Sequence, residues 1–290
     1  HFIDFETTMV AIPFNKGRHP YEQMAFQFSH HVLTADGRVE HRTEYINRER
    51  GKFPNFDFVR ALKTALSSDS GTIFRYAAHE NTVLCQIYQQ LRGSGEPDTE
   101  ELIAWIETIT KSTSDQFEKL GFAWEGKRNM VDLCELVKRY FYHPLTHGSN
   151  SIKKVLPAIL KTSDFLQNRY AKPIYGADGC ISSKNFKDWR WITKDANGSV
   201  VDPYKLLPPI FSDLDLETMD SLITDGSIAD GGAAMTAYAR MQFTEMSDTE
   251  RDRVAEALLK YCELDTFAMV MIFEHWKHEL EVVGSKSRAA

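Results

Sequence analysis

Three extended runs open the chain, and they constrain the fold more than any other feature of the sequence. Residues 1–7 (HFIDFET), 21–33 (YEQMAFQFSHHVL) and 38–47 (RVEHRTEYIN) are rich in aromatic and β-branched side chains, and Ala35-Asp36-Gly37 makes a turn between the last two. Consecutive strands joined by turns pair in antiparallel fashion. The sequence therefore predicts three leading antiparallel strands.

Helices and short strands alternate after these three runs. The apolar run at 71–76 and the start of 129–141 predict two further strands. The helix after Ser149 is expected to end near Pro157, because proline lacks the N–H that an inner helical turn needs. Helical spacing is found at 56–66, 80–91, 98–110, the later part of 129–141, 149–157, 233–243 and 248–281. This order predicts an α/β fold with a mixed sheet flanked by helices.

The length of the chain fits one large domain. With 290 residues, 42% of them hydrophobic, the chain can bury a sizeable core. We expect a single domain over 1–290 with a less regular insertion at about 163–227, in which Asn197-Gly198 is typical of a hairpin turn. The first residue is His1 and not Met, so we expect a fragment of a longer chain whose other domains are its partners.

Charge and cysteine spacing exclude several classes of protein. A net charge of −7 is not typical of a protein that coats nucleic acid with a basic face, although it allows a local basic groove and divalent metal ions. The four cysteines form no CxxC pair, which argues against a disulfide framework or a zinc knuckle and favours a cytoplasmic location. No apolar run has the length of a membrane span, so no membrane partner is expected.

Two carboxylates share one face of the first strand. Asp4 and Glu6 stand at i and i+2, so both point one way while Ile3 and Phe5 point the other way, toward a core. Acids this close repel each other, and a divalent cation bound between them removes the repulsion. The alternative is that both acids line the water-facing side of an edge strand.

Two later motifs also carry acids. Glu80 lies where the strand at 71–76 gives way to a helix, and ligands of α/β sheets gather at such strand ends. The alternative is an acid that only stabilises the helix N-terminus. Tyr261 and Asp265 stand at i and i+4 on the last helix, in an apolar stretch where a carboxylate needs a partner such as a metal ion. The alternative for Asp265 is an acid at a helix boundary facing water.

The order and setting of these motifs resemble the 3′→5′ exonucleases of the DEDD superfamily, in the variant that carries tyrosine, which have an RNase H-like fold. FIDFETT at 2–8 resembles their first motif, YAAHENTVL at 76–84 the second and YCELDTFAMV at 261–270 the third. Those enzymes usually have Asp in the second motif where this chain has Glu80, so Asp132 in NMVDL is a second candidate. The sequence also resembles a bacterial domain family of unknown function that carries this signature.

The resemblance implies a metal-dependent hydrolase of phosphodiester bonds. Asp4, Glu6, Glu80 and Asp265 would hold two Mg²⁺ or Mn²⁺ ions about 3.5–4 Å apart, and Tyr261 would orient the attacking water. The implied partner is the 3′ end of single-stranded or frayed DNA or RNA. The competing function is a catalytically weak or inactive RNase H-like module that binds nucleic acid or protein, which the Glu80 departure and the acidic net charge favour.

Four further residues are expected at the substrate. Thr7 and His79 adjoin the acids of the first and second motifs, and a structural hydrogen bond is the alternative for His79. Ser151 and Lys153 stand at a helix start, where a backbone phosphate can bind. The alternative for this pair is a helix cap followed by a solvated basic turn.

Overall fold

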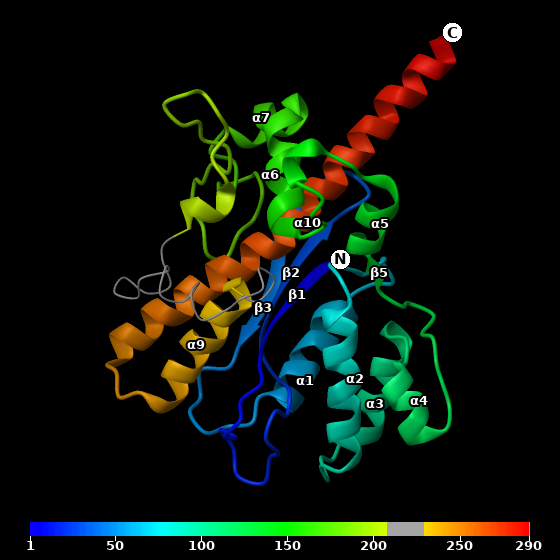
Figure 1. The fold of residues 1–290 in the computed structure, drawn as a ribbon, viewed down its shortest axis with the longest axis vertical. Coiled ribbons are helices and arrows are strands. Elements are labelled where there is room, and N and C mark those ends of the chain that lie inside the picture. The colour runs from blue at the N-terminus through cyan, green and yellow to red at the C-terminus, as the bar shows by residue number, and fades with distance from the viewer. Residues whose placement is uncertain (208–228, 290) are drawn as a thin grey trace.

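A five-stranded mixed sheet forms the centre of the computed structural model, which describes residues 1–207 and 229–289 (Figure 1). The strands, in the spatial order β3-β2-β1-β4-β5, are β1 (Phe2–Thr8), β2 (Met24–Leu33), β3 (Val39–Ile46), β4 (Phe74–Arg75) and β5 (Val131–Asp132). β2 is antiparallel to β1 and β3, whereas β4 is parallel to β1 and β5. The predicted mixed α/β fold with three leading antiparallel strands is confirmed.

The two faces of β1 carry different side chains, as the strand period of two requires. Ile3 and Phe5 are buried on one face, where the ring of Phe5 packs edge-on against Phe58 at a centroid distance of 4.8 Å. Asp4 and Glu6 are directed to the other face. The strand is central in the sheet, so neither acid belongs to an edge strand.

Helices cover both faces of the sheet. On the Phe5 face, α1 (Asn55–Leu66), α2 (His79–Arg92) and α3 (Thr99–Ile109) bury one apolar core. On the Asp4 face, α10 (Asp248–Ala289) lies against β1 and β2. It shares its cores with α5 (Leu133–Tyr140), α6 (Ile152–Thr162), α7 (Asp164–Tyr170) and α9 (Ala229–Phe243). The other elements are α4 (Ser114–Leu120) and the 3₁₀ turns η1 (Pro144–Thr146) and η2 (Pro203–Leu206).

The long helix α10 connects distant parts of the molecule. It has 42 residues, crosses the sheet, and extends beyond it at its C-terminal end (Figure 1). The residues from Leu264 to Ile272, near the middle of the helix, are buried. Within residues 1–207 and 229–289, no helix combines the length and the apolar character that crossing a bilayer requires.

The structure corrects the predicted end of one helix and adds another. The prediction that the helix after Ser149 ends near Pro157 is wrong, because α6 continues to Thr162. Proline removes one backbone hydrogen bond, and burial of Ile159 and Leu160 beyond it keeps the helix continuous. The sequence pattern did not predict α4, which begins with a capping box formed by Thr113 and Gln116.

The stretch expected to be an irregular insertion is described up to residue 207. It begins with α7, continues as irregular chain that packs on α10, and ends in η2. The predicted turn at Asn197-Gly198 is present, since Asp195 N donates to Ser199 O at 2.9 Å. Residues 208–227 of this stretch lie outside the described residues.

Candidate metal and active site

The acids of β1 meet the middle of α10. Carboxylate oxygens of Asp4 and Glu6 and the sulfur of Cys262 all lie within 4.8 Å of one another. The Cys262 thiol donates to Asp4, with 3.6 Å between Sγ and Oδ2. Burial and the charges of Asp4 and Glu6 raise the pKa of this thiol well above its usual value, so it stays protonated. Cys262 is therefore a buried donor to Asp4 and not a nucleophile.

Four carboxylates from three elements influence one another here. Burial raises the pKa of Asp4 well above its usual value, and the charges of Asp265, Glu80 and Glu6 raise it further. Glu6 is 7%, Glu80 1% and Asp265 8% exposed, so water screens their charges poorly. Asp265 is thus a buried acid within a helix and not a water-facing acid at a helix boundary. The structure places the four acids that the sequence singled out as metal ligands near enough for the charges of the other three to act on Asp4.

Glu80 is the most deeply buried of the four. It is the second residue of α2, and none of the described residues donates a hydrogen bond to its Oε2. Burial raises the pKa of Glu80 from 4.5 to about 8, and the positive charge of Arg75 only partly offsets this. A buried carboxylate oxygen that receives no hydrogen bond is suited to bind a metal ion.

Asp132 is the second candidate metal ligand, but the protein itself already supplies hydrogen-bond donors to its carboxylate. Its carboxylate accepts hydrogen bonds from Arg75 Nη1 at 2.9 Å, Ala77 N at 3.0 Å and Cys134 N at 2.9 Å. Ala77 has a φ of 70°, a left-handed conformation that is unfavourable for alanine. Asp132 therefore caps α5 and fixes the turn that leads into α2 and presents Glu80.

Tyr261 and Asp265 each accept a hydrogen bond from a residue of another element. Lys153, on α6, donates to the Tyr261 hydroxyl, and its Nζ lies 4.8 Å from the centre of the Tyr261 ring. Tyr204, on η2, donates to Asp265, with 2.6 Å between its hydroxyl and Oδ1. Lys153 was predicted to bind substrate, and the structure places it beside the predicted catalytic tyrosine. Sequence reasoning missed Tyr204, because no periodic pattern marks this tyrosine within an irregular stretch.

The other predicted substrate residues are Thr7, His79 and Ser151. Thr7 Oγ1 and His79 Nε2 are 3.1 Å apart, so the tip of β1 and the start of α2 are linked at an exposed position. Ser151 is exposed and precedes α6, and its side chain makes no capping hydrogen bond to the helix. Ser151 is nevertheless the N-cap residue of α6, since Val155 N donates to its carbonyl oxygen at 2.9 Å, so the cap alternative stays open. His79 has the structural partner considered as its alternative.

A second buried acid cluster lies on the same helix. His41 Nδ1 is 3.2 Å from Glu263 Oε2, and Glu44 is close by. Donors from the stretch after α7 surround Glu263, so this carboxylate is neutralised without a cation. They are Tyr175 at 2.6 Å, Ser183 at 2.5 Å and Asn185 at 2.8 Å.

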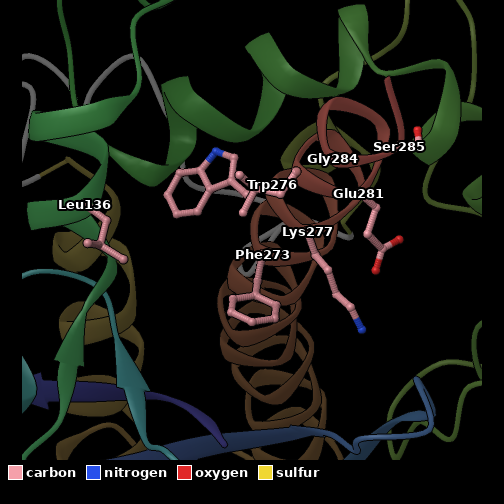
Figure 2. A pocket seen from close by; sticks show the side chains of 8 residues that line it. Leu136, Phe273, Trp276, Lys277, Glu281, Gly284 and Ser285 are labelled. Atoms are coloured by element: carbon pink, nitrogen blue, oxygen red, sulfur yellow. The ribbon is translucent and has the colours of Figure 1, made fainter. Parts of the chain in front are cut away.

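An apolar groove lies farther along α10, between that helix and α5. It has a volume of about 600 Å³, and Figure 2 shows Leu136 on one side and Phe273 and Trp276 on the other. These walls offer little to a phosphodiester or a metal ion, so the candidate site for chemistry is the group of four acids.

The four acids fit hard divalent cations. Mg²⁺ and Mn²⁺ prefer oxygen ligands, and Asp4, Glu6, Glu80 and Asp265 supply only carboxylate oxygens. The raised pKa values of Asp4 and Glu80 show that these acids lack sufficient neutralisation from the protein itself. A cation would remove this deficit, because it favours the charged form of each acid.

Comparison with models of protein families identifies the family of this chain. The model of a domain of unknown function, DUF2779, matches residues 1–151. The chain belongs to this family. Comparisons with curated proteins and with solved structures give no match. The family segment spans β1 to β5 and contains Asp4, Glu6 and Glu80, whereas Tyr261 and Asp265 come from α10, beyond it.

Proposed function

We propose that this chain is a metal-dependent 3′→5′ exonuclease with an RNase H-like fold, acting on the 3′ end of single-stranded or frayed DNA or RNA. The observation that carries the proposal is the buried group of Asp4, Glu6, Glu80 and Asp265. Burial raises the pKa of Asp4, and the charges of the other three acids raise it further. Such crowding is tolerable when cations bind among the acids. The mixed sheet with three leading antiparallel strands supports the RNase H-like assignment.

Each of these residues has a role in the proposed reaction. Asp4, Glu6, Glu80 and Asp265 would hold two Mg²⁺ or Mn²⁺ ions, which when bound supply an activated water and neutralise charge on the leaving oxygen. Tyr261 would orient the water by a hydrogen bond, since a phenol is a poor base at neutral pH.

Substrate contacts would come from residues around the acids. Lys153, beside Tyr261, places a positive charge where a backbone phosphate would approach. Thr7 and His79 lie at the outer end of β1 and the start of α2, and Ser151 adds a hydroxyl near the start of α6. These four residues would hold the terminal nucleotides of the strand.

Digestion of labelled strands tests the proposal. Single-stranded DNA and RNA with a 5′ label are incubated with the protein and Mn²⁺, and a ladder of products shortened from the 3′ end is expected. Asp4→Asn should lower the rate by about 10³-fold or more, because loss of a ligand removes several kcal/mol of transition-state stabilisation.

Asp36→Asn is the matched control, because it makes the same change at an exposed turn. Digestion by this variant should equal that of the wild type. If the wild type binds Mn²⁺ and nucleic acid but cuts neither strand, the chain is a binding module with this fold. If it neither cuts nor binds Mn²⁺, the proposed function is wrong.

A further inference from the structure

Three tyrosines in the stretch 170–204 donate hydrogen bonds to carboxylates along α10. The pairs are Tyr170 with Glu274, Tyr175 with Glu263 at 2.6 Å, and Tyr204 with Asp265 at 2.6 Å. The first two pairs lie away from the four crowded acids. The third reaches one of those acids from an element that the sequence did not connect with the site.

The backbone around Tyr204 is held in place locally. The Asp202 side chain accepts a hydrogen bond from Tyr204 N at 3.1 Å, and the buried Pro203 fixes φ at the start of η2. The rings of Tyr204 and Tyr261 are 6.2 Å apart, and Lys153 Nζ lies 5.4 Å from the Tyr204 ring centre. The phenol therefore approaches Asp265 from a defined direction.

We propose that Tyr204 is a positioning residue whose phenol holds the Asp265 carboxylate in the orientation that binds a divalent cation. This inference rests on the proposed function, because it treats Asp265 as a cation ligand. A carboxylate has about four acceptor positions on its two oxygens, so it can accept from a phenol and also bind a cation. A hydrogen-bonded partner restricts rotation of such a ligand, and losing the partner typically lowers metal affinity by about 10–100-fold.

The chemistry of Tyr204 suits this role. A tyrosine phenol ordinarily keeps its proton at neutral pH, so it can donate to the Asp265 carboxylate, 2.6 Å away. Its hydroxyl is bound to Asp265, so Tyr204 acts through that ligand and not directly on the substrate. The role thus predicts an effect on cation affinity more than on the rate at saturating cation.

Tyr204→Phe tests this proposal, since it removes only the hydroxyl. Mn²⁺ binding is measured from the electron paramagnetic resonance signal of the free ion, and the Mn²⁺ dependence of strand digestion is measured in parallel. The dissociation constant for Mn²⁺ should rise by about 10–100-fold. The digestion rate at saturating Mn²⁺ should fall much less.

Tyr175→Phe is the matched control, because it removes an equally short phenol–carboxylate bond two residues away on α10. Its Mn²⁺ affinity should equal that of the wild type. Tyr204→His, whose ring N–H can donate, should recover part of the lost Mn²⁺ affinity. It also tests the positioning role if the phenylalanine variant does not fold.

The outcomes separate this inference from the proposed function. Equal Mn²⁺ affinity in Tyr204→Phe and the wild type overturns the positioning role and leaves the proposed function standing. Equal weakening in Tyr204→Phe and Tyr175→Phe also overturns it, since the loss would then come from general packing. Absence of Mn²⁺ binding in the wild type overturns both.

Discussion

Glu263 and Asp265 stand two residues apart on α10, yet their surroundings are opposite. Glu263 faces His41 and Tyr175 and is neutralised by donors from the protein. Asp265 accepts a hydrogen bond from Tyr204 but faces Asp4, so acids lie close to other acids on that side of the helix. Positions i and i+2 of a helix point in nearly opposite directions, which is why one short sequence supplies both environments.

The two surroundings shift the pKa values of the buried acids in opposite directions. Burial raises the pKa of Glu263, but the close contact with His41 and the hydrogen bonds from Ser183 and Tyr175 more than reverse this, and the net shift is downward. For Glu80 and Asp4 the net shift is upward, because burial dominates. Burial alone does not distinguish Glu263 from Glu80, because both are buried; the hydrogen-bond donors around each carboxylate do.

The same substitution at the two sites should change stability in opposite directions, and this is the largest effect we expect. In metal-free protein at pH 7, Glu80→Gln should raise the free energy of unfolding by about 3 kcal/mol, because it removes an acid whose pKa rises from 4.5 to about 8. Glu263→Gln should lower it by about 3 kcal/mol, since it breaks a buried pair with His41. Urea unfolding in the presence of a chelator measures both.

A shift of the same sign in both variants would contradict the comparison. It would mean that the donors around Glu263 contribute no more than those around Glu80. Asp36→Asn again serves as the control for loss of one negative charge at an exposed position.

In the metal-free protein, the raised pKa of Glu80 should make the free energy of unfolding decrease as pH rises. The folded-state pKa of Glu80, about 8, exceeds the ordinary 4.5, so its contribution is full below about 4.5 and is lost as pH rises through about 8. The free energy of unfolding should therefore fall between these values, by about 1.4 kcal/mol per pH unit for each proton involved.

Saturating Mn²⁺ should flatten this dependence, because the ion replaces the proton. Glu80→Gln should reduce the slope, whereas Glu263→Gln should retain it, since the pKa of Glu263 is shifted downward. A stability that is constant over this range in metal-free wild type would show that the acids are neutralised in some other way. Denaturant unfolding in a pH series provides the data.

The smallest change in stability is expected for a substitution at Asp132. Its carboxylate resembles that of Glu263 in being surrounded by donors, so Asp132→Asn should cost about 1 kcal/mol through the weakened α5 cap. Mn²⁺ stoichiometry, measured by equilibrium dialysis, should stay that of the wild type. Loss of a Mn²⁺ equivalent in Asp132→Asn would instead make Asp132 a ligand.

Residues close in sequence could be assigned to faces before the structure was known. The strand period predicts that Asp4 and Glu6 share a face, and the helix period predicts the same for Tyr261 and Asp265. Both periods are local steric properties of the backbone. The same local logic failed at Pro157, because burial of the following turn outweighed one missing hydrogen bond.

Relations between distant elements could not be assigned in this way. Sequence reasoning left Glu80 and Asp132 as alternatives, and only the contacts of Asp132 with Arg75 and Ala77 separate their roles. Tyr204 carried no signal, because its partner is 61 positions away and its own segment has no period.

The sequence by itself determined which side chains each strand or helix presents together, since covalent geometry fixes those directions. Only the tertiary structure decided which presented groups meet, and whether a buried acid such as Glu263 finds donors or, like Glu80, finds too few. That outcome depends on packing between elements far apart in the chain, where burial and charge act over a few ångströms of space and not over positions in sequence.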